Sequence, residues 1–199
     1  MIALDIETSG LIPGKHGILA IGAVDFDDPT NQFYDECRLW EGACIDEAAL
    51  AINGFSHEEI TDASKKSEGE LIRDFIAWAT DRPKDQTCAG QNPSFDRDFV
   101  NAACKRAGLE FPFAHRTIDT HTLCWLHMIQ HGIEPPTKNS HSAISLDTAL
   151  RYCGMPEEPK PHNALTGALS HAEVIARIAY TKKLIPDFFT YDIPWNKTT

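Results

Sequence analysis

The first 40 residues contain three segments whose patterns predict β-strands, and this start constrains the chain to a fold built on a sheet. In the first segment, Ile2, Leu4 and Ile6 recur at every second position, which is the period of a strand. Residues 18–26 and 32–40 predict the second and third strands. The short connection between these two favours an antiparallel meander.

Helices and short strands alternate over the rest of the chain. Capping-box patterns at Ser56 and Ser67 predict two helix starts, and the second helix is expected to end before Pro83. The other expected elements are helices at 46–51, 94–107, 121–130, 145–153 and 163–184, strands at 87–90 and 117–120, and a loop at 134–142. This order predicts one α/β domain, residues 1–184, with helices packed on a mixed sheet. The aromatic tail, residues 185–199, is expected to dock on that domain or to contact a partner.

Composition narrows the range of functions. The 199 residues fit one domain, and the formal net charge of −11 excludes a protein that grips nucleic acid by covering phosphates with basic side chains. Nucleic acid would be held locally or through bound cations. No stretch reaches the roughly 18 apolar residues that span a membrane, so no membrane partner is expected. The first ten residues lack the basic residues of a secretory or transit signal, which makes the cytoplasm the expected location.

Asp5 and Glu7 place two carboxylates on one face of the first strand, because side chains two apart in a strand point the same way. The opposite face is apolar, so the strand is expected to be largely buried. Burial disfavours ionised carboxylates, and adjacent ones repel each other. A cation that prefers oxygen ligands, Mg²⁺ or Mn²⁺, would offset both effects. The alternative is a strand end at the solvent edge, with both acids hydrated.

Two further residues are candidates for the same site. Asp96 ends the segment NPSFD, where a strand leads into a helix, although the helix dipole alone also favours an acid in a first turn. His162 follows a proline-rich loop and precedes the last helix, a place suited to a general base. The alternative for His162 is an exposed loop histidine. Asp98, two residues after Asp96, faces another side of its helix.

Three motifs in order resemble those of DEDD-type 3′-5′ exonucleases, the group that contains the DNA polymerase III proofreading subunit and ribonuclease T. They are DIETSGL at residues 5–11, NPSFD at 92–96 and, in the variant with histidine, HNALTGA at 162–168. Residues 45–60 and 117–120 also resemble segments of these enzymes. The resemblance implies a ribonuclease H-like fold, which is a five-stranded mixed sheet flanked by helices. It also implies hydrolysis of phosphodiester bonds at the 3′ ends of single-stranded DNA or RNA.

The resemblance implies a role for each motif residue. Two Mg²⁺ or Mn²⁺ ions would activate water and stabilise the leaving oxygen. Asp5 would bridge both ions, Glu7 would hold the water-activating one, and Asp96 would support the second. His162 would accept the proton of the attacking water. The residues expected to contact the terminal nucleotide are Thr8, Leu11 and Phe95. A homodimer or a polymerase partner is left open.

The third motif departs from the family pattern at one position. It normally carries an aspartate five residues after its histidine, where this chain has Gly167. Glycine offers no ligand atom and costs roughly 1 kcal/mol inside a helix relative to alanine. Three interpretations remain: an engineered inactivating change, a lineage that kept only nucleic-acid binding, or a substitute ligand, for which His171 is the candidate. A non-catalytic nucleic-acid-binding module on the same fold is therefore the alternative function.

Overall fold

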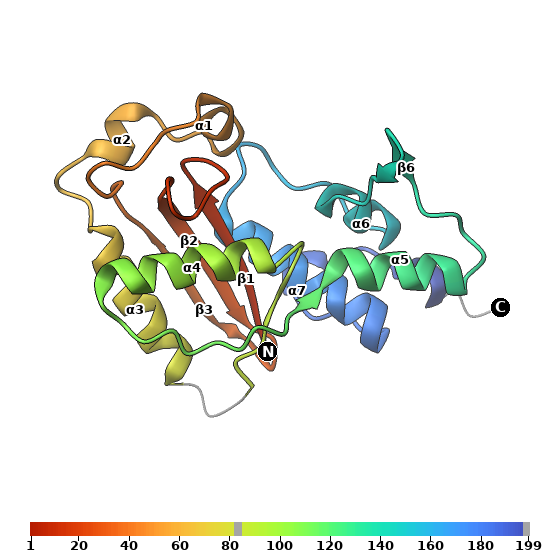
Figure 1. The fold of residues 1–199 in the computed structure, drawn as a ribbon. Coiled ribbons are helices and arrows are strands. Elements are labelled where there is room, and N and C mark those ends of the chain that lie inside the picture. Colours follow the sequence, from red (N-terminus) through yellow and green to blue (C-terminus); the bar gives the residue numbers. More distant parts are fainter. Residues whose placement is uncertain (82–84, 197–199) are drawn as a thin grey trace.

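The structure is a computed structural model that describes residues 1–81 and 85–196, and a five-stranded sheet forms its centre (Figure 1). The strands are β1 (Ile2–Thr8), β2 (Ile18–Asp25), β3 (Asp28–Glu36), β4 (Cys88–Gly90) and β5 (Ile118–Asp119). Their order across the sheet is β3-β2-β1-β4-β5. The β1–β2 and β2–β3 pairs are antiparallel, whereas the β1–β4 and β4–β5 pairs are parallel. The predicted mixed sheet is confirmed.

Helices cover both faces of this sheet. They are α1 (Glu47–Asn53), α2 (His57–Thr61), α3 (Glu68–Thr80), α4 (Ser94–Ala107), α5 (Thr120–Gln130), α6 (Leu146–Tyr152) and α7 (Ala164–Tyr180). Figure 1 shows α3 and α4 on one face and α7 on the other. Leu4 and Ile6 pack with α3 and α4, while Ala3 packs against α7. Asp5 and Glu7 alternate with Leu4 and Ile6, so they project from the α7 face.

The first turn of α7 lies directly against β2 at Gly22. A Cβ atom at Gly22 would overlap the backbone of Ala164, so the close approach requires glycine. Gly22 pairs with Asp5 across the β1–β2 ladder. This contact therefore brings the segment that carries the third motif beside Asp5.

Two predicted elements are placed differently. The strand expected at 32–40 is β3, which starts at Asp28 because the chain reverses in a tight turn and Asp25 pairs with Asp28. The expected helix at 163–184 ends at Tyr180, because Thr181 adopts a left-handed conformation with φ of 53°. The end expected for the helix before Pro83 falls partly outside the described residues, and α3 itself ends at Thr80.

The expected loop at 134–142 was also wrong in part. It contains a short hairpin of β6 (Thr137–Lys138) and β7 (His141–Ser142). The two residues between these strands, Asn139 and Ser140, both have positive φ angles of 51° and 64°. Positive φ at both central residues gives the hairpin turn whose twist suits two antiparallel strands.

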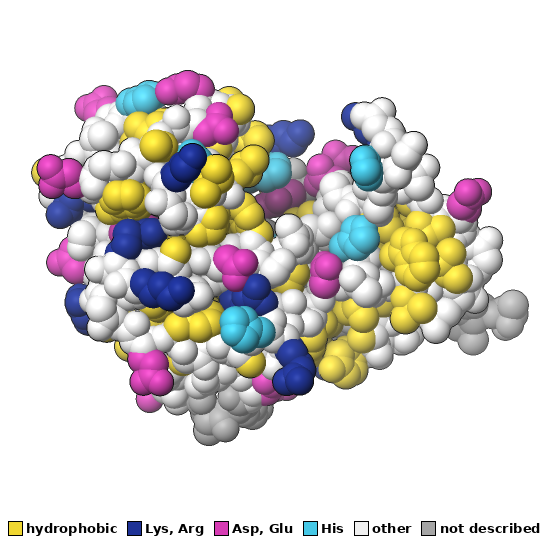
Figure 2. All heavy atoms as spheres, viewed as in Figure 1, with side chains coloured by type: hydrophobic (Ala, Val, Ile, Leu, Met, Phe, Trp, Pro, Cys, Tyr) yellow, Lys and Arg dark blue, Asp and Glu magenta, His cyan; other side chains and the backbone are white. Residues whose placement is uncertain are grey.

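The chain beyond α7 contacts the body of the domain. It contains two short 3₁₀ helices, η1 (Pro186–Phe188) and η2 (Pro194–Asn196), and it buries Ile185 and Ile193. Residues 197–199 of the expected tail lie outside the described residues. Hydrophobic side chains also gather on the surface over α5 (Figure 2), where Trp125, Leu126 and Ile129 are exposed. Within the described part of the chain, no helix combines the length and apolar character needed to cross a bilayer.

Candidate active site

The end of β1 supplies two of the predicted site residues. Beyond Ala3, β1 is no longer paired with β4, since the parallel ladder covers only Ile2 and Ala3. The backbone N–H of Ile6 is therefore free of that ladder, and it donates to the Asp96 side chain at 3.1 Å. Asp96 comes from the first turn of α4. This hydrogen bond ties the start of α4 to the strand that carries Asp5 and Glu7.

The segment before α7 brings His162 to the same place. The Asn163 side chain caps α7 by accepting from the backbone N–H groups of Leu165 and Thr166, at 3.0 and 3.3 Å. His162 directly precedes this cap, and its side chain is about one-third exposed. His162 and Glu7 line one cavity of about 220 Å³. The structure thus gathers Asp5, Glu7, Asp96 and His162, which are spread over more than 150 residues of sequence.

A second cavity adjoins the first, and it collects the residues expected to contact a nucleotide. Its volume is about 240 Å³, and its lining includes Thr8, Leu11 and Phe95. Glu7 and Asn53 line both cavities. The Leu11 side chain is 70% exposed at the rim. The Asn53 amide donates to the Thr8 carbonyl at 3.0 Å and so fixes α1 to the end of β1.

The carboxyl groups of the site have strongly shifted pKa values. Burial, followed by the negative charges of Asp96 and Glu7, holds the pKa of Asp5 well above its usual range. Burial raises the pKa of Glu7 to about 8, helped by the charges of Glu158 and Asp96. Burial also raises the pKa of Asp96 to about 7. Such shifts are typical of functional sites and mean that the cluster favours protons or other cations.

Glu158 is a fourth carboxylate near these three, and the sequence analysis did not single it out. Only 7% of it is exposed, and its side chain accepts a hydrogen bond from the Thr166 hydroxyl at 2.9 Å. His162 Nδ1 lies 3.8 Å from its Oε2 atom. The one available signal was its position four residues before His162, but charges in a proline-rich loop usually face solvent.

Gly167 and His171 differ in what they face. Gly167 lies under Asp5, and a Cβ atom there would be 2.8 Å from Asp5 Cγ. His171 is buried, and its Nδ1 atom lies 3.2 Å from the Leu4 carbonyl oxygen, a geometry in which Nδ1 donates. Burial lowers the pKa of His171 to about 4. The role of His171 as a substitute ligand stays a prediction, since its one observed hydrogen bond goes to the backbone.

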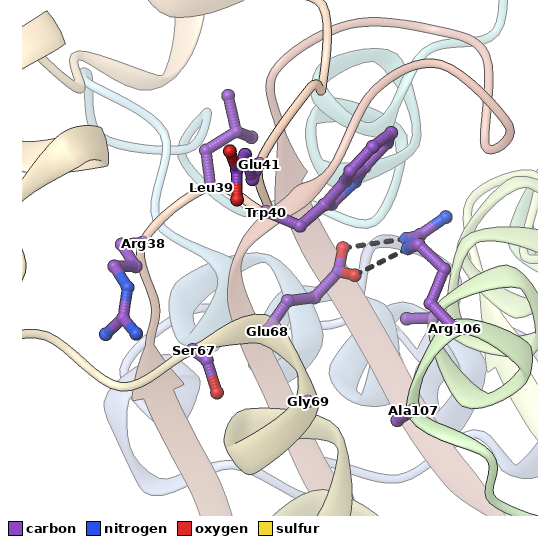
Figure 3. Close-up of a pocket in the computed structure, with 10 residues that line it drawn as sticks. Arg38, Leu39, Trp40, Glu41, Ser67, Glu68, Gly69, Arg106 and Ala107 are labelled. Atoms are coloured by element: carbon purple, nitrogen blue, oxygen red, sulfur yellow. Dashed lines mark hydrogen bonds and ion pairs between the residues drawn. The ribbon is translucent and has the colours of Figure 1, made fainter.

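A larger cavity lies away from this site. Its volume is about 420 Å³, and Figure 3 shows Glu68 and Arg106 facing each other in it. The Arg106 guanidinium donates two hydrogen bonds to Glu68, at 2.7 and 2.8 Å. The Glu68 carboxylate also accepts from the Ile18 N–H at 2.9 Å. The charges of Arg106 and Glu68 neutralise each other. Arg106 is about 15 Å along α4 from Asp96, so this cavity is separate from the carboxylate cluster.

Comparisons with known proteins identify nucleases among the relatives of this chain. The chain is 28% identical over 181 residues to ribonuclease T of Vibrio campbellii, an alignment that covers 77% of this chain and 84% of that protein. It is 29% identical over 189 residues to the 3′-5′ DNA exonuclease Cap18 of Escherichia coli, covering 92% and 95%.

Solved structures with the same fold include two nucleases. One is exonuclease I of E. coli in complex with a 5cy-dT13 oligonucleotide, with a TM-score of 0.71 and 16% identity. The match covers 95% of this chain but only 42% of exonuclease I. The other is the nuclease domain of 3′hExo, a DEDDh family member bound to rAMP, with a TM-score of 0.66, 15% identity and coverage of 92% and 93%. The ribonuclease H-like sheet expected from the sequence is confirmed.

The family model of the 3′-5′ exoribonuclease Rv2179c-like domain matches residues 1–179, which is nearly the whole described chain. The resemblance stated from the three motifs is thereby confirmed. The chain belongs to the 3′-5′ exoribonuclease Rv2179c-like domain family, and it shares its fold with a DEDDh family member.

Proposed function

We propose that this chain uses Mg²⁺ or Mn²⁺ to hydrolyse phosphodiester bonds at the 3′ ends of single-stranded DNA or RNA. The observation that carries the proposal is the convergence of Asp5, Glu7 and Asp96 beside His162, at the junction of two cavities. Both nucleic acids are included because one relative is named a ribonuclease and another a DNA exonuclease. Solved neighbours hold a deoxyoligonucleotide or rAMP.

The donor set fits a hard divalent cation. All of its charged donors are carboxylate oxygens, the ligands that Mg²⁺ and Mn²⁺ prefer. Glu7 is only 8% exposed, and among the described residues no hydrogen bond or ion pair reaches its carboxylate. Among the same residues, no three His, Cys, Asp or Glu side chains already lie in a metal-holding arrangement. We infer that three side chains would reorient toward a bound ion, those of Asp5, Glu7 and Asp96, because its positive charge would offset their mutual repulsion.

Each motif residue has a task in this proposal. When bound, the cations supply an activated water and stabilise charge on the leaving oxygen. His162 accepts the proton of the water that attacks the phosphorus. The cavity with Thr8, Leu11 and Phe95 receives the terminal nucleotide, with the apolar side chains against the base. The scissile phosphate then lies near Glu7, which both cavities share.

The net charge of −11 is consistent with this proposal if binding is local. A protein that neutralised many phosphates with basic side chains would be steeply salt-dependent. Here the cations in one pocket carry the attraction. The cytoplasmic location, a homodimer and a polymerase partner stay predictions from the sequence.

Gly167 supports a second candidate function, a non-catalytic module that binds single strands. A degradation assay distinguishes the two functions. End-labelled single-stranded DNA and RNA are incubated with Mn²⁺ and either the parent chain or the matched variant G167D. Shortening from the 3′ end that stops in excess chelator supports the enzyme. Binding without turnover in both proteins supports the module, and degradation that continues in chelator contradicts the metal-dependent mechanism.

If only G167D degrades the substrate, the chain is a nuclease that lacks one ligand. That result supports the first interpretation of Gly167, an inactivating change, and leaves the rest of the site intact.

A further inference from the structure

Gly167 leaves the first turn of α7 without the carboxylate that the third motif of the family carries. In this chain the turn presents Thr166 and Gly167. The Thr166 hydroxyl donates to Glu158 at 2.9 Å, so the turn holds a carboxylate that comes from the preceding loop.

Glu158 is buried in a place where a loop carboxylate ordinarily would not be. Its exposure is 7%, and its backbone N–H donates to Asp147 at 3.2 Å, which fixes the loop. The nearest basic group that faces it is the His162 ring at 3.8 Å. Buried glutamates are rare unless they are paired or bind a metal. Its hydrogen bonds come from neutral groups, the Thr166 hydroxyl and the Asn163 backbone N–H, and neither balances its charge.

Glu158 also lies close to the other carboxylates. Its partner Thr166 precedes Gly167, where an added Cβ atom would be 2.8 Å from Asp5 Cγ. In agreement with this placement, the charge of Glu158 contributes to the raised pKa values of Asp5 and Glu7. Glu7 is independently buried and has no partner among the described residues. Four carboxylates from β1, α4 and the loop before α7 are therefore near neighbours, although no three of them already form a metal-holding arrangement among the described residues.

We propose that Glu158 supplies the fourth carboxylate of the cation site, in place of the aspartate that Gly167 replaces. The proposal rests on the proposed function, because it assigns a further oxygen donor to the same site. Thr166 positions Glu158, and His162 stays beside it for the proton transfer.

Mn²⁺ binding to the full chain, measured by calorimetric titration, tests this assignment. Gln at position 158 keeps an oxygen that accepts from Thr166 but removes the charge, so a merely structural Glu158 would tolerate E158Q. We expect E158Q to bind Mn²⁺ at least about tenfold more weakly than the parent chain. Substitution of a residue that only supports a metal ligand already lowers metal affinity by about that factor. E157Q is the control, because Glu157 is the exposed neighbour that pairs with Arg151, and its Mn²⁺ affinity is expected to stay unchanged.

The double variant E158Q/G167D provides a rescue. It returns a carboxylate to the α7 turn beside Asp5. The Cβ atom at position 167 displaces Asp5, as any side chain there does, but the added carboxylate supplies the charge that alanine lacks, so we expect it to recover most of the Mn²⁺ affinity lost in E158Q. Thermal unfolding in chelator measures whether each variant is folded. If the melting temperature of E158Q is much lower than that of the parent chain, E158D, which keeps the charge, takes its place. E158D is then expected to bind Mn²⁺ more tightly than E158Q, measured at a temperature where both are folded.

Two failures are distinguishable. If the parent chain binds no Mn²⁺ and degrades nothing, the proposed function fails. If the parent binds Mn²⁺ and degrades single strands while E158Q does both equally well, only the assignment of Glu158 is overturned.

Discussion

The carboxyl group of Asp5 lies directly over Gly167, in the space that a side chain at position 167 would occupy. An added Cβ atom would be 2.8 Å from Asp5 Cγ and closer still to Oδ2. Gly167 is therefore more than a missing ligand, because its lack of a side chain sets where Asp5 lies. Any residue other than glycine has to move Asp5.

The first prediction concerns G167A. Alanine should favour the helix by roughly 1 kcal/mol, but its methyl group pushes Asp5 away from its position. We expect turnover to fall between about tenfold and a hundredfold, as misplacement of a reacting group by about 1 Å can do, without a loss of thermal stability.

G69A is the control for that prediction. Gly69 lies in the first turn of α3, and a Cβ atom there would meet Ala107 Cβ at an ordinary 3.7 Å. It should leave turnover unchanged. Full activity in G167A would show that Asp5 can move without consequence.

Local patterns predicted those parts of the fold that depend on neighbours in sequence. Both capping boxes form. The Ser56 and Ser67 hydroxyls accept from the backbone N–H three residues later, and the glutamate at that position accepts from the serine backbone N–H. These motifs could be predicted because all of their partners lie within four residues. The strand ending at Glu36 was shifted by four residues in the prediction because its register depends on pairing with β2.

The part of the site that escaped prediction depends on contacts between distant segments. Glu158 resembles a solvated loop charge until α7 and β1 are placed beside it. Gly22 likewise has no local signature, because its role is to admit the backbone of Ala164. Asp5, Glu7, Asp96 and His162 could be found from the motifs, since the resemblance carries long-range information that periodicity lacks.

A second prediction separates Asp96 from its neighbour Asp98. Asp96 is buried at the cluster, whereas the Asp98 side chain is 54% exposed and pairs with Arg97. D96N keeps an oxygen to accept from the Ile6 N–H but loses the charge. We expect its 3′-5′ turnover to fall about a hundredfold or more, beyond the range typical of residues that only support a ligand. The turnover of D98N is expected to remain within about twofold of that of the parent, because substitutions of exposed side chains usually have small effects. Equal losses of turnover in D96N and D98N would contradict the assignment of Asp96 to the site.

The metal-free protein should lose stability as the pH rises. The folded-state pKa of Glu7 is about 8 and that of Asp96 about 7, above the values of 4.5 and 3.8 for unperturbed groups. The folded state therefore holds protons that the unfolded state has already released, so the free energy of unfolding decreases up to about pH 8. In chelator, we expect the melting temperature to fall by at least about 2 °C from about pH 6.5 to about pH 8.5, which corresponds to a loss of about 1 kcal/mol or more in a chain of this length.

The same measurement contains its own checks. E7Q removes one of the titrating groups and should flatten the profile, and saturating Mn²⁺ should reduce the fall in the parent. A melting temperature that rises across this range would contradict the shifted pKa values of the cluster.

The last prediction concerns Arg177, which is fully buried and holds the chain beyond α7 in place. Its Nε donates to Glu173 at 2.6 Å, and its Nη2 donates to the carbonyls of Phe188 and Tyr191 at 2.9 and 3.0 Å. R177M leaves the Glu173 carboxylate buried without its counter-charge, which costs about 3–5 kcal/mol of unfolding free energy in comparable pairs. Urea unfolding measures this loss, with R151M as the control, because the Arg151–Glu157 pair is exposed and such pairs contribute about 0–1 kcal/mol. A loss below about 1 kcal/mol in R177M would mean that residues 185–196 dock without this ion pair.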